Sequence, residues 1–113
     1  MAVPHINWLF GGFLAWKDEV AKTADYTIVA ADNGTLFTNT GAVGAVVYTL
    51  PALAENLRFG FYVTAGQTVT VASAAGDDMV VFNDATADSV AFSTTSEKIG
   101  GGVICQSNEA GTK

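Results

Sequence analysis

The stretch DNGTLFTNTGAVGAVVYTLP, residues 32–51, decides the fold class of this chain. It places a tight turn, a short strand, a glycine-rich turn and a longer strand within twenty residues. The longer strand ends at Pro51, which has no amide hydrogen to donate. Asparagine and glycine tolerate the positive φ that tight turns require. The residues expected to shape these turns are Asn33, Gly34, Asn39, Gly41 and Gly44.

Short strands and polar turns continue on both sides of this stretch. We expect strands at residues 26–30, 36–38, 45–50, 57–64, 67–72, 79–82, 89–93 and 97–105. In residues 57–64 the side chains alternate between two faces of the strand. One face carries Leu57, Phe59, Phe61 and Val63, and the other carries Arg58, Gly60, Tyr62 and Thr64. The segment NDATAD, residues 83–88, is typical of a turn. About eight short strands predict an all-β domain, either a small antiparallel sandwich or a barrel.

The composition favours a protein that associates with other chains. Half of its 113 residues are hydrophobic and only 14% are charged, against about 25% in an average domain. These are too few charged side chains to cover the surface of a small soluble domain. We therefore infer that part of the surface is buried against another chain. Five basic residues against eleven acidic ones give a net charge of −6. This balance argues against binding to nucleic acid or to an anionic membrane.

The N-terminal residues form a separate apolar segment. We assign residues 1–22 to an arm and residues 23–113 to the β domain. Residues 6–16 carry no charge, but eleven residues are too few to span a membrane, which takes about 20. The arm or short helix either covers its own domain or docks on a partner, and residues 17–22 can continue a helical turn. The candidate partner contacts are Trp8, Leu9, Phe10, Phe13 and Trp16.

No residue pattern indicates catalysis. His5 is the only imidazole and lies near the terminus, which disfavours a serine triad. Cys105 is the only cysteine, and we interpret it as a small buried hydrophobic residue on the last strand. The acidic residues of the segments 77–78 and 83–88 lack the glycine and the closing glutamate of a calcium loop. We therefore expect no catalytic residue, no cofactor and no metal.

One segment resembles a known class of protein. The run YTIVAADNGTLFTNTGAVGAVVYTLP, residues 26–51, is similar to a recurring segment of tailed-bacteriophage virion proteins. The shared pattern is a Tyr-Thr strand, an Asp-x-Gly turn, a short Phe strand, Asn-x-Gly-Ala-x-Gly, and a strand that ends in Leu-Pro. The similarity continues more loosely through LRFGFYV and QTVTVA. The aromatic N-terminal stretch and the C-terminal ending do not belong to the pattern.

The resemblance implies a function. Such segments occur in small head-decoration proteins, head fibres and tail fibres, commonly as trimers. The expectation is a non-enzymatic virion protein, a homotrimer that decorates or cements a phage capsid and is anchored in part by its N-terminal arm. Its partners would be further copies of itself and the major capsid protein or another virion protein. The alternative is a receptor- or glycan-binding module of a tail fibre, which an exposed aromatic cleft would favour.

Overall fold

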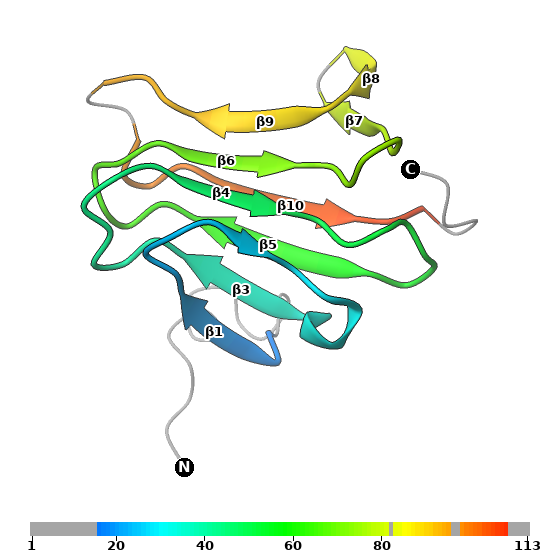
Figure 1. The fold of residues 1–113 in the computed structure, drawn as a ribbon, viewed down its shortest axis with the longest axis horizontal. Helices are drawn as coiled ribbons and strands as arrows, with labels where there is room; N and C mark the ends of the chain where they lie inside the picture. The colour runs from blue at the N-terminus through cyan, green and yellow to red at the C-terminus, as the bar shows by residue number, and fades with distance from the viewer. Residues whose placement is uncertain (1–15, 82, 96–97, 109–113) are drawn as a thin grey trace.

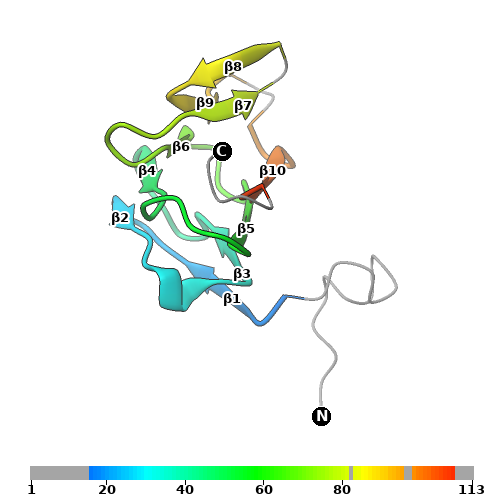
Figure 2. The same cartoon turned by 90° about the vertical axis from the view of Figure 1, so that its right-hand side faces the viewer.

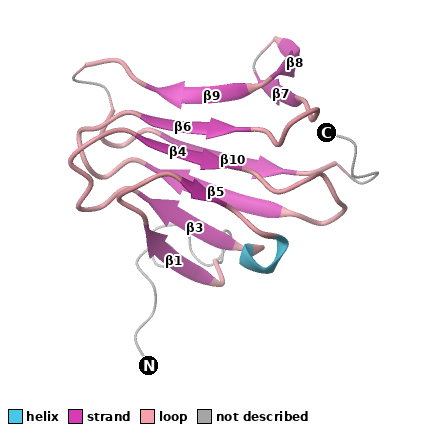
Figure 3. Ribbon diagram, viewed as in Figure 1, coloured by secondary structure: helices cyan, strands magenta, loops and turns pink. Residues whose placement is uncertain are grey.

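The computed structural model describes residues 16–81, 83–95 and 98–108, and these residues are almost entirely β structure. Ten short strands form two four-stranded sheets and one two-stranded sheet (Figure 1). The elements are β1 (Asp18–Ala21), β2 (Tyr26–Thr27), η1 (Ala30–Asp32), β3 (Thr35–Thr38), β4 (Val46–Thr49), β5 (Arg58–Tyr62), β6 (Val69–Ala72), β7 (Met79–Val81), β8 (Asp84–Ala87), β9 (Ser89–Phe92) and β10 (Gly102–Gln106). Within the described residues the helical element is the short 3-10 turn η1 (Figure 3). The predicted all-β class is confirmed.

The chain winds by alternating between the two larger sheets. Sheet A has the strand order β1-β3-β5-β10, and sheet B has the order β2-β4-β6-β9. Each step along the chain from β1 to β6 crosses to the other sheet, so β3 lands beside β1 and runs parallel to it. We call one strand of sheet A together with the following strand of sheet B a coil. Strand β3 and strand β4 make one coil, and β5 and β6 make the next, stacked in parallel on it.

The predicted antiparallel arrangement is wrong for most of the strand pairs. Four pairs are parallel, namely β1–β3, β3–β5, β2–β4 and β4–β6. Three are antiparallel, namely β5–β10, β6–β9 and β7–β8. Parallel neighbours need a long return connection, and here the strand in the opposite sheet supplies it. The last two strands, β9 and β10, reverse direction and form the edges of their sheets.

The inner faces of the two sheets share one hydrophobic core (Figure 2). Aromatic rings from successive coils meet there. Phe37 of β3 lies 5.8 Å from Phe61 of β5 and 5.2 Å from Tyr48 of β4, measured between ring centroids. The Tyr48 hydroxyl donates to the Thr38 carbonyl at 2.5 Å, and burial raises the pKa of Tyr48 to about 12. The shared face predicted for residues 57–64 is the buried one, since Phe59, Phe61 and Val63 are all buried.

Asn39 joins one coil to the next at the corner after β3. Its side chain is fully buried. Its Nδ2 donates to the Ala65 carbonyl at 3.1 Å, and its Oδ1 accepts from the backbone amides of Thr64 at 2.9 Å and Ala65 at 3.0 Å. These three bonds satisfy backbone groups at the matching corner of the following coil, after β5. Asn39 therefore fixes the stacking of two corners.

Asn33 has the same role at the other end of β3. Its Oδ1 accepts from the Arg58 amide at 2.7 Å, and its Nδ2 donates to the Asn56 carbonyl at 2.9 Å. Gly34 follows with φ of +86° and donates its amide to the Arg58 carbonyl at 2.8 Å. A side chain at this φ would be strained. The coil that contains β3 is thus held to the next coil by an asparagine at each end.

Two of the predicted strands are shorter than expected, since β2 ends at Thr27 and β10 begins at Gly102. Two segments for which no strand was predicted are strands. The helical turn predicted over residues 17–22 is wrong, because Asp18–Ala21 is strand β1 and pairs with β3. The β structure therefore begins within the range that we assigned to the arm. The turn predicted over residues 83–88 is also wrong, because Asp84–Ala87 is strand β8 and pairs with β7. Both strands are largely exposed, so they lack the hydrophobic alternation from which a strand is predicted.

Candidate interaction surface

The outer face of sheet A is the face turned away from the core, and it is the first candidate surface. Side chains alternate along a strand, so Phe59 and Phe61 point inward while Arg58, Gly60 and Tyr62 of β5 point outward. The register places Gly60 between Leu36 of β3 and Ile104 of β10.

Trp16 packs onto this outer face at Gly60. A Cβ added to Gly60 would lie 2.5 Å from Cη2 of Trp16 and 2.9 Å from Cδ1 of Leu36. Glycine is therefore needed here for close approach. Trp16 is 8% exposed, and the Arg58 guanidinium lies 4.7 Å from the centroid of its ring, within the range of a cation–π contact. The tryptophan is thus fixed between a glycine notch and an arginine.

Two large hydrophobic side chains beside Trp16 remain half exposed. Tyr62 and Ile104 each keep 45% of their surface. Ile104 is directly opposite Gly60, and Tyr62 is two residues further along β5 on the same face. We call Trp16, Arg58, Tyr62 and Ile104 the sheet A patch. It combines an aromatic and aliphatic surface with one cation, a composition that is typical of the centre of protein interfaces.

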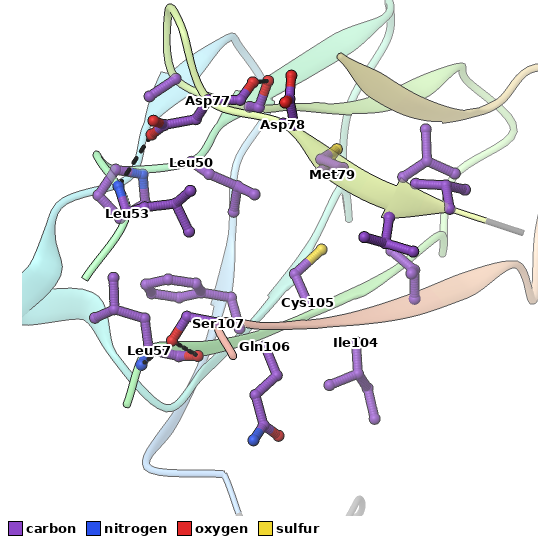
Figure 4. A pocket seen from close by; sticks show the side chains of 18 of the residues that line it. Leu50, Leu53, Leu57, Asp77, Asp78, Met79, Ile104, Cys105, Gln106 and Ser107 are labelled. Atoms are coloured by element: carbon purple, nitrogen blue, oxygen red, sulfur yellow. Dashed lines mark hydrogen bonds between the residues drawn. The ribbon is translucent and has the colours of Figure 1, made fainter. Parts of the chain in front are cut away.

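The second candidate is an apolar cavity of about 430 Å³ on the inner side of β10 (Figure 4). Leu50, Leu57 and Met79 contribute to its wall. Asp77 and Asp78 also line it, and Asp77 Oδ2 accepts from the Leu53 amide at 3.0 Å. The volume is in the range of small-molecule sites, and the wall is mainly aliphatic. It therefore differs from the aromatic cleft that would favour glycan binding.

Cys105 points toward this cavity, while the labelled Ile104 and Gln106 on either side of it point away (Figure 4). Burial raises the pKa of the Cys105 thiol to about 11. The thiol is therefore protonated at neutral pH, and the thiolate that would act as a nucleophile is scarce. Cys105 also packs against the core, in agreement with its interpretation as a small hydrophobic residue.

The structure places the predicted site residues in two groups. Of the candidate partner contacts, Trp8, Leu9, Phe10 and Phe13 lie outside the described residues, as does His5. Trp16 packs on its own sheet. Four of the predicted turn residues, Asn33, Gly34, Asn39 and Gly41, lie at the corners of the coil that contains β3. The positive φ expected at Gly41 or Gly44 occurs at Gly41, at +85°.

Sequence reasoning missed the other members of the sheet A patch. One signal was present, because a glycine inside the most aromatic strand indicates close approach of another group. Arg58 and Tyr62 were expected on the same face as Gly60. Nothing in the sequence placed Ile104 beside them, because that contact depends on the pairing of β5 with β10.

Comparison of the chain with protein families, curated proteins and solved structures finds no match. Among the described residues, no helix is both long and apolar enough to cross a membrane.

Proposed function

We propose that this chain is a non-enzymatic structural protein of a phage virion, which associates with copies of itself and decorates or cements the capsid. One observation carries the proposal. Residues 26–51, which resemble a recurring segment of virion proteins, extend from the start of β2 through β3 to just beyond β4. They begin on sheet B, cross to sheet A and return beside their starting point, since β2 and β4 are neighbours. The resemblance therefore covers one full turn of the winding chain.

The physical character of the domain supports this role. Stacked coils joined by the side chains of Asn33 and Asn39 make a framework in which each coil contacts its neighbours. The low charge and the half-exposed sheet A patch favour association. The arm joins the domain at Trp16, on the outer face of sheet A.

The N-terminal arm provides part of the anchorage in this proposal. Burial of a large hydrophobic side chain gains about 1.5–3 kcal/mol, so the aromatic residues before Trp16 offer several kcal/mol in total. Ordering of the arm opposes this gain by about 1–2 kcal/mol per fixed residue. One arm should therefore bind weakly. Three arms joined in a trimer should bind much more strongly, because the second and third contacts form at a high effective concentration.

Co-sedimentation with purified empty capsids of the source phage tests the proposal. The full chain is compared with a variant that lacks residues 2–15 and keeps Trp16 in its notch. We expect the full chain to sediment with capsids, and the shortened chain to remain folded by circular dichroism but stay in the supernatant. If the full chain does not sediment with capsids, the decorating role is wrong. If the shortened and folded chain still sediments, the anchor lies in the β domain.

The cavity beside β10 favours a second candidate, a receptor-binding module of a tail fibre. An apolar wall with carboxylates at its margin is a plausible site for part of a receptor molecule. Immunogold electron microscopy of the native virion separates the two candidates. Label on the head supports decoration, and label on the tail together with binding of the purified protein to host cells supports the receptor module.

A further inference from the structure

Two buried nitrogen atoms of the sheet A patch have no hydrogen-bond partner among the residues that the structure describes. They are Nε1 of Trp16 and Nη2 of Arg58. The two side chains are in contact, with the guanidinium 4.7 Å from the centroid of the indole ring. Buried donors are nearly always paired in folded proteins, and leaving one unpaired is unfavourable. Two unpaired donors in one place indicate that the described part of the chain, residues 16–81, 83–95 and 98–108, supplies no acceptor there.

The same face of sheet A carries a carboxylate that fits this requirement. Glu19 of β1 pairs in register with Leu36, which pairs in turn with Gly60, so Glu19 lies in the same outward row as the Trp16 notch. Its side chain is exposed, and among the described residues it has no ion pair or hydrogen bond. A carboxylate accepts strong charge-assisted bonds from guanidinium and ring N–H groups.

We propose that the outer face of sheet A is the surface through which copies of this chain associate. The β5–β10 half of the face of one copy packs against the β1 edge of the next. In this contact Glu19 of a second copy accepts from Trp16 and Arg58, while Tyr62 and Ile104 become covered. The inference rests on the self-association included in the proposed function. It identifies the face and the atoms through which two copies make contact.

The arrangement of groups on the face determines the kind of assembly. The donors of Trp16 and Arg58 and the acceptor of Glu19 lie on different halves of one surface, toward opposite edges of sheet A. A contact between unlike halves is heterologous, and its repetition gives a ring, such as a trimer, if the rotation closes, and an open filament if it does not. Both nitrogens are buried in the isolated chain, so the side chains around Trp16 must shift when the second copy docks. The half-exposed Tyr62 and Ile104 supply apolar surface for the contact.

Charge reversal tests the pairing by analytical ultracentrifugation from 1 to about 100 µM protein. Loss of one partner of a buried charged pair weakens association by about 30-fold or more. We therefore expect Arg58→Glu to raise the dissociation constant at least that far, and Glu19→Arg in the same chain to recover most of the loss. Val43→Glu, at a corner position that is 94% exposed, is the matched control and should associate as the wild type does. Circular dichroism confirms that each variant is folded.

Disulfide cross-linking tests the face without relying on a destabilising change. In a Cys105→Ser background, Ala21→Cys protein, with the new thiol two residues after Glu19 on the same exposed side of β1, is mixed with Ile104→Cys protein and oxidised. Formation of the mixed disulfide supports the proposal, with Val43→Cys in place of Ile104→Cys as the control. If the wild type associates but neither the mixed disulfide nor the effect of Arg58→Glu is found, this face is wrong while self-association stands.

One outcome overturns self-association as well, namely a wild-type chain that remains monomeric throughout the concentration range. In that case, alkylation of Ile104→Cys in the same background tells whether the patch is open to solvent or covered by another part of the same chain. A monomeric chain does not decide whether the protein binds capsids, which the co-sedimentation experiment measures separately.

Discussion

Replacement of Asn39 by alanine should destabilise the fold far more than its position in a corner suggests. The change removes the acceptor for the Thr64 and Ala65 amides and the donor to the Ala65 carbonyl. Three backbone groups then lose their partner. A buried polar group without a partner costs about 1–3 kcal/mol. Thr64 and Ala65 are only partly buried, so water can replace some of these bonds, and we expect a total loss of about 2–4 kcal/mol.

Urea denaturation followed by circular dichroism measures this loss. A domain of this size loses about 4–8 °C of melting temperature per kcal/mol, so a loss of about 2–4 kcal/mol should lower the melting temperature by about 8 °C or more. Thr40→Ala is a suitable control, because the exposed Thr40 makes only hydroxyl–hydroxyl contacts in the same corner. A loss below about 1 kcal/mol for Asn39→Ala would refute the conclusion that Asn39 holds the two coils together.

Three further predictions concern single residues. Gly60→Ala should lower the melting temperature, because its Cβ would lie 2.5 Å from the Trp16 ring; Gly44→Ala, with open space around it, should leave it unchanged. Gly41→Val should cost about 1–2 kcal/mol in urea denaturation, because Gly41 has φ of +85°; an unchanged unfolding midpoint would contradict this. Burial raises the pKa of Cys105 from 9.0 to about 11, so the unfolded chain loses this proton first. The free energy of unfolding should therefore fall as the pH rises from 9 to 11, and Cys105→Ala should reduce that fall.

The sequence predicts the positions and the buried faces of the central strands better than their pairing. Alternation in residues 57–64 correctly indicates that Phe59 and Phe61 face inward, because that pattern depends only on the local period of a strand. The same alternation occurs whether the neighbouring strand is parallel or antiparallel. The winding path was therefore not predictable from it, even though the turns at Asn33 and Asn39 were.

Edge strands and the interaction surface were harder to predict, for different physical reasons. Strand β1 begins with Asp18 and Glu19. Charged residues on an edge strand discourage edge-to-edge hydrogen bonding with a strand of another chain. They also interrupt the hydrophobic alternation from which a strand is predicted. The sheet A patch depends on long-range pairing, which brings Ile104 opposite Gly60. The uncharged run that ends at Trp16 suggested the aromatic part of the patch. The sequence pattern did not suggest that Arg58 belongs to it.

The placement of the first and last strands has a mechanical consequence. β1 and β10 occupy opposite edges of sheet A, and the start of β1 and the end of β10 lie at the same end of that sheet, linked across it through Gly34 and Arg58. Tension between these two points acts across the strands. It would open the edge hydrogen bonds one after another, as a zipper opens, instead of loading them together in shear. The domain should therefore resist only weakly a pull applied between the start of β1 and the end of β10.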